Sequence, residues 1–542
     1  MNALGPATWT LGIALLSMPA RADSGKKLIE YGWDRPNTST YRQRVRDMEK
    51  VGFDGVVIAV EVPGQPGQDL GWKVFSTERF DPDWVEPAIA DLQAARSDVL
   101  TDNFIAVQSY KGVEWFAPQW DSVCANVALM ARVAKQGGCK GIMFDAEEYG
   151  KYNALWTYDA FAPEQKAAHT FDECRAQARR RGREFIQAIQ AEFPDIALLL
   201  LWGPSRTYER ALKEPREKAR YSLLADFCDG ICEAGAPGIT LIDGCEQTYG
   251  FRARAQFAKE RQAVLQGAAE FSAVPEAYRA HIRAGMSIWM DRWSTYVGWN
   301  TTVFEKNYFT PAEFRNSAAY ALEAADYYVW IYSERLNWWT GEHLPGPYLE
   351  ALRRAKAGPG PDIPERKFAL PPRAARIPGY SDAETFASYR ESMDEALDLP
   401  KENWRFAQDE KDAGEREQWF AAEHDDSKWA PIGIGEFWEY ELERMFDGIG
   451  WYRRTIDVPS LPAGRRVFLV AGAADEAAWV WVNGKLAGSH DVGEQGWDKS
   501  FSLDVTDFIQ PGQPNVLAIR VRDATGMGGL WKSIKLMVAK ER

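Results

Sequence analysis

The residues best suited to chemistry in this chain are Asp145, Glu147 and Glu148, which directly follow the strand-forming run G-I-M-F. Asp145 and Glu147 stand two positions apart, so an extended backbone would direct both side chains to the same side. Two carboxyl groups at one pocket mouth push their pKa values apart, and one of them can keep its proton. Acids also favour the first turn of a helix, and that alternative explains many short acidic runs.

The acidic run lies in one of eight predicted strands that alternate with helical segments from residue 27 to about 350. The predicted strands are Lys27–Trp33, Gly55–Glu61, Asn103–Tyr110, Gly141–Glu147, Ile196–Trp202, Ile239–Asp243, Gly285–Asp291 and Tyr327–Ser333. Helical patterns lie between them, as at Thr40–Val51, Trp84–Arg96 and Phe171–Phe193. This alternation predicts a parallel α/β fold, a (β/α)8 TIM barrel. The sixth strand is the least distinct, because Asp229–Gly235 competes for its place.

Acids and aromatics recur where these strands end, and such ends form the active face of a barrel. The candidate catalytic acids are Asp145, Glu147, Glu246, Asp291 and Glu334. The candidate substrate-binding residues are Trp33, Tyr110, Glu148, Trp202, Asp243, Tyr249, Trp289, Trp330, Trp338 and Trp339. Any one acid could instead be a cap or an ion-pair partner, and any one aromatic could belong to the core. Their repetition on many strand ends favours a carbohydrate site.

This mixture suits glycoside hydrolysis, which needs a carboxylic acid for the leaving oxygen and a second carboxylate for the anomeric carbon or a water molecule. We expect Glu147 to be the general acid and Asp145 to hold it in place. Glu246 and Asp291 are the favoured partners and are not ranked, and Glu334 is a further candidate. A polysaccharide lyase using Arg35, Arg292 or Tyr110, and a non-catalytic carbohydrate-binding protein, remain alternatives.

The barrel resembles (β/α)8 glycoside hydrolases that carry their acid at the end of strand four. The run D-A-E-E-Y over Asp145–Tyr149 is similar to the D-x-E-Y ending of the chitinase-like family 18 motif. The acids that precede that motif are replaced by Ile142 and Met143. Ala146-Glu147 stands where the large retaining superfamily has Asn-Glu, and that superfamily keeps a Glu nucleophile on strand seven, near Asp291. The resemblance implies a general class and no single family.

After a Pro- and Gly-rich segment, the pattern changes to short strands with turns, typical of an all-β sandwich. The predicted strands are Trp451–Val458, Arg466–Ala471, Glu476–Val482, Lys499–Val505 and Asn515–Val521. Asn483-Gly484 is a hairpin signal, because both residues tolerate the positive φ of a type I′ turn. We therefore predict a signal peptide over residues 1–22, a barrel over 23–356, a linker over 357–400 and a sandwich over 401–542.

The sandwich resembles the jelly-roll sugar-binding domain of glycoside hydrolase family 2, in the wider galactose-binding-like group. The resemblance rests on D-D-S-K-W at Asp425–Trp429, D-G-I-G-W-Y-R at Asp447–Arg453, V-N-G at Val482–Gly484, Gly488, and N-V-L-A-I-R-V at Asn515–Val521. It implies a jelly-roll fold and a carbohydrate-enzyme context, with no catalytic role. In this chain the module follows the barrel instead of preceding it.

The amino-acid composition and the N-terminal segment indicate which partners the protein binds and in which compartment it works. The chain has 78 acids against 64 bases, which argues against binding to nucleic acid or anionic membranes. Its 23 Trp and 21 Tyr suit sugar stacking or large aromatic cores equally. Trp9 to Met18 is mostly apolar and precedes Ala20-Arg21-Ala22, so we predict cleavage after Ala22 and a periplasmic or extracellular protein.

Metal-ligand spacing is absent from the sequence, so we expect neither a metal nor another cofactor. The six cysteines lie before residue 250 without zinc-site spacing, and only five His are available. Asp145, Glu147 and Asp291 could in principle hold Ca²⁺, yet no EF-hand-like loop accompanies them. Export would permit a disulfide, and the sequence assigns none.

Overall fold

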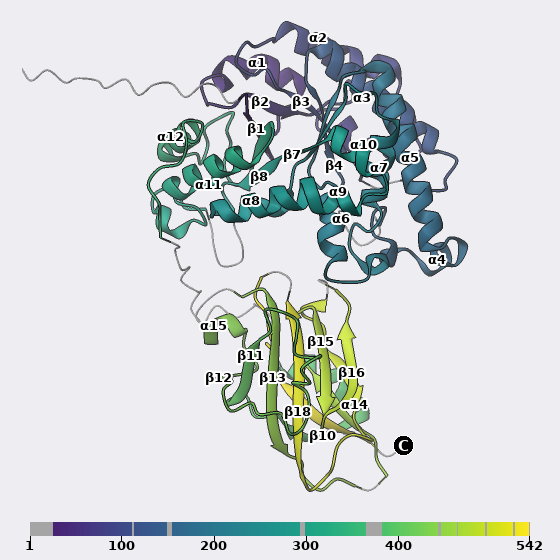
Figure 1. The fold of residues 1–542 in the computed structure, drawn as a ribbon, viewed down its shortest axis with the longest axis vertical. Helices are drawn as coiled ribbons and strands as arrows, with labels where there is room; N and C mark the ends of the chain where they lie inside the picture. The colour runs from purple at the N-terminus through teal and green to yellow at the C-terminus, as the bar shows by residue number, and fades with distance from the viewer. Residues whose placement is uncertain are drawn as a thin grey trace, which may run out of the picture. The chain divides into compact units, whose positions relative to one another are not determined.

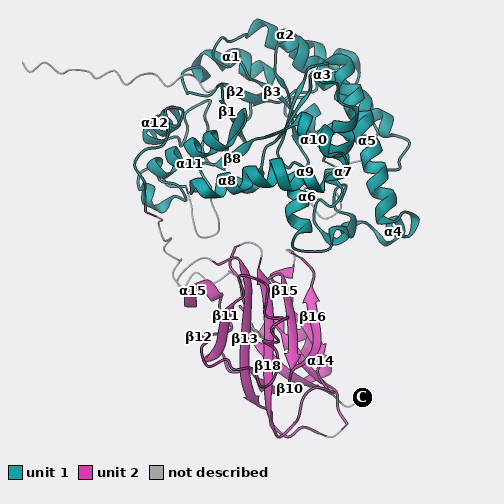
Figure 2. Ribbon diagram, viewed as in Figure 1, with its two compact units in different colours: residues 1–363 teal, residues 364–542 magenta. Residues whose placement is uncertain are grey.

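The computed structural model describes residues 25–110, 113–148, 154–292, 299–364, 382–442, 446–462, 464–493, 496–523 and 526–540. The chain divides into two compact units, residues 1–363 and 364–542, shown in Figure 2. The predicted signal peptide, residues 1–22, and the central part of the predicted linker lie outside the described residues. No described helix has both the length and the apolar character needed to cross a membrane.

The first unit is a barrel of parallel strands, as predicted. Its strands are β1 (Lys27–Gly32), β2 (Gly55–Ile58), β3 (Phe104–Gln108), β4 (Gly141–Asp145), β5 (Ala197–Leu200), β6 (Thr240–Asp243), β7 (Ile282–Ala284), β8 (Met286–Trp289) and β9 (Tyr328–Ser333). They follow chain order, and β1 pairs with β9 to continue the ring. β7 pairs with β6 and β8 pairs with β9, so these two short strands on either side of Gly285 share one of eight positions.

Helices surround these strands on the outside (Figure 1). They are α1 (Thr38–Met48), α2 (Glu86–Ala94), α3 (Trp120–Gly137), α4 (Pro163–Ala168), α5 (Phe171–Glu192), α6 (Pro204–Ala211), α7 (Leu224–Ala234), α8 (Arg254–Gln262), α9 (Ala268–Phe271), α10 (Pro275–His281), α11 (Pro311–Ala324) and α12 (Gly346–Ala355). The segment that competed for strand six lies in or beside α7, whose residues from Leu224 to Cys232 are all buried. Thr170 and Thr310 begin α5 and α11 with capping boxes.

Two apolar layers hold the barrel together. Alternate strand residues such as Ile29, Val57 and Leu199 fill its interior. Their neighbours, such as Leu28 and Leu198, face the helices in a larger core. Because both faces are buried, the strands read as continuous apolar runs, and polar side chains are left for the positions where strands end.

The second unit is a sandwich of two antiparallel sheets, in the strand orders β10-β19-β14-β17 and β12-β11-β13-β18-β15-β16. Its strands are β10 (Met393–Asp398), β11 (Trp404–Gln408), β12 (Ala430–Ile432), β13 (Gly448–Asp457), β14 (Val467–Ala471), β15 (Ala477–Val482), β16 (Lys485–Asp491), β17 (Phe501–Asp504), β18 (Pro514–Asp523) and β19 (Ile534–Ala539). Short helices α13 (Asp382–Thr385), α14 (Ala387–Ser392) and α15 (Trp438–Leu442) accompany them.

Two local features of the sandwich bear on the sequence-based expectations. Asn483 and Gly484 both have positive φ, 51° and 78°, between the paired strands β15 and β16, as the hairpin signal predicts. β10 lies within the predicted linker and pairs with β19, so the ordered sandwich begins before residue 401. The charged and exposed residues of this edge strand gave little sign of it in the sequence.

Candidate active site

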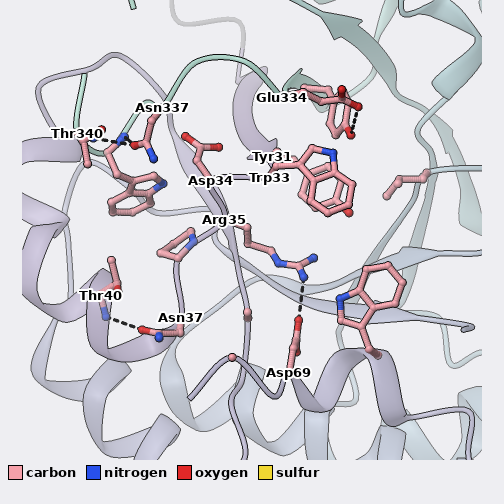
Figure 3. A pocket seen from close by; sticks show the side chains of 18 of the residues that line it. Tyr31, Trp33, Asp34, Arg35, Asn37, Thr40, Asp69, Glu334, Asn337 and Thr340 are labelled. Carbon is pink, nitrogen blue, oxygen red and sulfur yellow. Dashed lines mark hydrogen bonds and ion pairs between the residues drawn. The ribbon is translucent and has the colours of Figure 1, made fainter. Parts of the chain in front are cut away.

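A cavity of about 660 Å³ opens where the barrel strands end. The predicted site residues that line it are Trp33, Glu147, Glu246, Tyr249, Trp289, Glu334 and Trp339. Figure 3 shows the wall contributed by the end of β1 and by the segment after β9. Acids from three separate strand ends, after β4, β6 and β9, therefore meet in one space.

Glu246 is the buried acid of this cavity. It follows β6 through Cys245, whose φ of 50° is left-handed, and its backbone N–H donates to the Leu201 carbonyl at 3.2 Å. The side chain is only 9 % exposed, and its Oε2 has no hydrogen-bond partner. Burial, followed by the charges of Glu147 and Asp145, raises the pKa of Glu246 well above its usual range. Both effects favour the protonated form of Glu246.

Glu147 is half-buried and reaches the same cavity from the end of β4. The Oδ1 atom of Asp145 accepts the backbone N–H of Glu147 at 2.7 Å. Asp145 is 2 % exposed and does not line the cavity. Asp145 therefore fixes the main chain that carries Glu147.

Aromatic rings form a continuous patch beside these acids. Tyr249 stacks on Tyr332, with ring centroids 5.2 Å apart and planes 18° apart. Trp289 stands edge-on to Tyr249 at 5.7 Å, and Tyr31 lies 5.8 Å from Tyr332. All four rings line the cavity, so they offer the apolar surface on which sugar rings stack.

Asp291, predicted as a possible catalytic acid, uses its carboxylate to bind backbone N–H groups. Its carboxylate accepts the backbone N–H groups of Glu334, Arg335 and Leu336 and the indole N–H of Trp289. The side chain is fully buried and does not line the cavity, and burial raises the pKa of Asp291 to about 6. Asp291 holds the turn that follows β9.

Asp243 and Glu148 also hold local structure. Fully buried Asp243 accepts the backbone N–H groups of Ser205 and Cys245. Glu148 accepts the backbone N–H groups of Trp156 and Thr157 and the Thr157 hydroxyl. Each carboxylate supplies acceptors to a loop, and neither lines the cavity. Tyr149, the last residue of the acidic motif, lies outside the described residues.

The predicted aromatic residues divide between rim and core. Trp33 is 71 % exposed on the cavity rim, and Glu334 beside the cavity accepts the Tyr332 hydroxyl at 2.9 Å. Trp330 is fully buried and donates its Nε1–H to the Gly244 carbonyl at 2.8 Å. Trp338 packs edge-on against Phe53 at 4.9 Å.

Three further predicted aromatic residues lie at the cavity or next to residues that line it. Trp339 lines the cavity and stands edge-on to Tyr41 at 6.2 Å. Tyr110 is half-buried and edge-on to Trp72, which lines the cavity, at 5.4 Å. Trp202 stacks on Tyr221 at 5.6 Å, next to the cavity-lining Leu201.

Several cavity residues were not among the sequence-based candidates for the glycosidase site, although Arg35 was named for the lyase alternative. They are Tyr31, Asp34, Arg35, Asn37, Thr40, Arg44, Glu61, Asp69, Trp72, Tyr332, Asn337 and Thr340. Arg35 forms an ion pair with Asp69 at 2.8 Å, drawn in Figure 3. The W-D-R ending of strand one was a usable signal for Asp34 and Arg35. Asp69 comes from a loop, and nothing in its local sequence marks it.

One described group of carboxylates is compact enough to hold a metal ion, and it lies in the sandwich. Oxygens of Asp475, Glu476 and Asp523 lie within 4.8 Å of one another, and all three residues are buried. Burial and the neighbouring acids raise the pKa of Asp475 to about 8 and that of Asp523 to about 10. These carboxyls therefore keep protons at neutral pH.

Residues 414–527 match the family model of the second all-β domain of β-galactosidases. The chain is 32 % identical over 122 residues to a β-glucuronidase of Paenibacillus borealis, covering 22 % of this chain and 20 % of that protein. It is 32 % identical over 114 residues to the β-galactosidase BoGH2A of Bacteroides ovatus, covering 21 % of this chain and 12 % of that protein.

Among solved structures, a β-glucuronidase of Bacteroides uniformis is 27 % identical, covering 26 % of this chain and 17 % of that one at a TM-score of 0.22. A Lactobacillus rhamnosus β-glucuronidase is 21 % identical, covering 27 % of this chain and 29 % of that one at a TM-score of 0.24. The chain spans about a fifth or less of the curated relatives it matches. The family model covers sandwich residues and no cavity residue.

Proposed function

We propose that this chain is a glycoside hydrolase that cleaves an oligosaccharide or polysaccharide with the carboxyl pair Glu246 and Glu147. The observation that carries the proposal is the contrast between these two acids in one cavity. Glu246 is buried with an unpartnered Oε2 and a raised pKa, whereas Glu147 is half-buried on a backbone fixed by Asp145. Two carboxyls with divergent environments are the requirement of this reaction.

The contrast supports a division of roles that differs from the sequence-based hypothesis. The surroundings of Glu246 favour its protonated form, so it suits the general acid that protonates the glycosidic oxygen as the bond to the anomeric carbon breaks. Glu147 suits the carboxylate that attacks the anomeric carbon or takes a proton from the attacking water. The patch formed by the rings of Tyr249, Tyr332 and Trp289 would offer the sugar an apolar surface to stack on.

Secretion and an accessory sandwich belong to the same proposal. The apolar segment from Trp9 to Met18, followed by Ala20-Arg21-Ala22, supports export. The sandwich forms a compact unit of its own and matches an all-β domain of β-galactosidases. We assign it a role in stability or substrate affinity, with the chemistry placed in the barrel.

The test is product analysis with the purified full chain on a panel of neutral and acidic oligosaccharides. We expect release of a reducing sugar, and proton NMR during the first turnovers would show whether the anomeric configuration is retained or inverted. Glu246→Gln and Glu147→Gln should each abolish release from natural substrates. An unsaturated uronate product would instead establish a lyase, and binding without turnover would establish a non-catalytic protein.

A further inference from the structure

The end of β5 lies between the carboxyl-bearing ends of β4 and β6, because β5 pairs with both strands. Three residues lie together here: Trp202 at this end, Arg206 on α6 and Tyr221 in the following loop. The charge of Arg206 acts on Glu246 and the charge of Glu246 acts on Tyr221, and none of the three lines the cavity itself. Trp202 and Tyr221 stack at 5.6 Å, and the Arg206 guanidinium carbon lies 4.5 Å from the Trp202 ring centroid. We call these three residues the β5 cluster.

Buried polar atoms without hydrogen-bond partners converge in this cluster. They are the Trp202 Nε1, the Arg206 Nε, the Tyr221 hydroxyl and the neighbouring Glu246 Oε2. Trp202 is 9 % exposed and Tyr221 is fully buried. A buried donor or acceptor without a partner costs about 1–3 kcal/mol. Three of them beside an acid whose own Oε2 also lacks a partner indicate that a polar ligand completes the site.

Tyr221 is held in this position at a conformational cost. Its φ of 61° is left-handed, which is unusual for a bulky residue. The Thr157 hydroxyl accepts its backbone N–H at 3.0 Å, and the Thr207 hydroxyl donates to its carbonyl at 2.7 Å. Strained backbone held by specific bonds concentrates at ligand sites. The two threonines thus place the unpartnered phenol close to Glu147 and Glu246, whose charges act on it.

Arg206 gives the cluster its charge. Within the part of the chain that the structure describes, no ion pair is formed by its guanidinium group. Burial and the charge of Arg210 lower the pKa of Arg206 to about 10, and Glu209 offsets this only in part. Lys213 and Arg220 add further positive charge nearby. A largely buried guanidinium among other cations is stabilised by an anion.

We propose that the β5 cluster is a saccharide subsite next to Glu246 that accepts a sugar bearing an oxyanion, either a sulfate or a carboxylate. The guanidinium of Arg206 binds the oxyanion, and the Trp202 Nε1 and Tyr221 hydroxyl bind sugar oxygens. The Trp202 ring stacks on Tyr221 and lies under Arg206, so it contributes its polar edge more than a stacking face. This proposal rests on the proposed function, because the β5 cluster is a subsite only if the cavity cleaves saccharides.

The experiment measures binding by ligand-observed NMR titration of the full chain with three probes: D-glucose, D-glucuronate and D-glucose 6-sulfate. We expect at least one charged probe to bind wild type about tenfold or more tightly than glucose, which is the gain of one charge-assisted contact. Comparison of the two charged probes identifies the oxyanion. Arg206→Gln should abolish the preference, and Arg206→Lys should restore part of it. Arg180→Gln, an exposed arginine of α5 paired with Glu184, controls for loss of a positive charge.

Tyr221→Phe provides a second test that does not depend on charge. Because the hydroxyl has no protein partner, we expect the variant to melt at or above the wild-type temperature while binding the preferred charged probe at least fivefold more weakly. Equal binding of all three probes to wild type, or an unchanged preference in Arg206→Gln, would overturn the proposal. Binding is read without turnover, so an oxyanion preference in a protein that cleaves no glycoside would refute only the proposed function.

Discussion

The Oδ1 atom of Asp145 lies 2.7 Å from the backbone nitrogen of Glu147 and accepts its N–H. This hydrogen bond fixes the backbone at the end of β4. Glu147, which lines the cavity, is therefore held in place by Asp145, which does not line it. Two neighbouring carboxylates in one motif thereby take different tasks. Asp145 acts on Glu147 through the main chain, and it acts on Glu246 through its charge.

Replacing Glu246 with Gln tests the assignment of the general acid. Loss of a general acid costs about 10²–10⁴ in rate, so Glu246→Gln should lose that much turnover on natural glycosides. Aryl glycosides whose leaving group needs no proton should suffer far less. Steady-state kinetics on both substrate types would check this, and equal losses on both would transfer the acid role to another residue.

Replacing Glu147 with Ala or Gln tests its proposed role as the second carboxylate. Here, unlike for Glu246→Gln, we expect losses of activity on both substrate types. In the proposed mechanism Glu147 acts at the anomeric carbon, so turnover should fall severely on natural and aryl glycosides alike. Added azide should restore activity of Glu147→Ala on an activated aryl glycoside, with a glycosyl azide as the product detected by mass spectrometry. Full activity of Glu147→Gln on a natural glycoside would remove Glu147 from the mechanism, and Glu334 would be tested next.

The pH profile should depend on Asp145. In the proposed mechanism the protonated form of Glu246 is the active one, so kcat/KM should fall as pH rises through the raised pKa of Glu246. The charge of Asp145 contributes to that rise, so Asp145→Asn should move the basic limb to lower pH while an amide oxygen still accepts the Glu147 N–H. A basic limb that stays in place in Asp145→Asn would contradict this coupling.

Two variants of Asp291 test whether its role is structural or catalytic. Asp291→Ala leaves three backbone N–H groups without their acceptor, and we expect a loss of about 1–3 kcal/mol in the free energy of unfolding. Asp291→Asn keeps an oxygen acceptor and should retain turnover within about tenfold of wild type, since a lost catalytic group costs 10²–10⁴. A stable Asp291→Asn without activity would make Asp291 part of the carboxyl pair.

The acids of the sandwich should make its stability fall in alkali. The pKa of Asp475 is raised to about 8 and that of Asp523 to about 10, above their values in the unfolded chain. The contribution of these two acids to the free energy of unfolding is fully present below the pKa that a carboxyl group has in the unfolded chain. It is lost as pH rises through the raised pKa values of the folded protein. Relative to wild type, Asp523→Asn should therefore gain stability between pH 6 and about 10 in calorimetry. Exposed Asp457→Asn is the control and should show no such trend.

The barrel could be predicted from the sequence because both faces of its strands are buried, which leaves apolar runs such as Leu198–Leu200 between amphipathic helices. Glu147 and Glu246 could be predicted because each follows such a run. The functions of Asp243 and Asp291 could not, since a strand-end acid that binds backbone N–H groups looks the same in sequence as one that faces a cavity. Arg206 and Tyr221 escaped prediction because only tertiary structure shows that their polar atoms lack partners.

The structural use of Asp291 has a consequence for where the reaction takes place. With the seventh strand position committed to holding the turn after β9, the proposed pair of acids stands after β4 and β6, two of eight positions apart. In the proposed mechanism this pair spans a quarter of the ring and would confine bond cleavage to one sector above β5. The opposite sector, where Asp34 and Arg35 line the cavity, is left free to hold the rest of a chain. Selectivity for the length of the saccharide can then be altered at β1 without disturbing the bond-breaking pair.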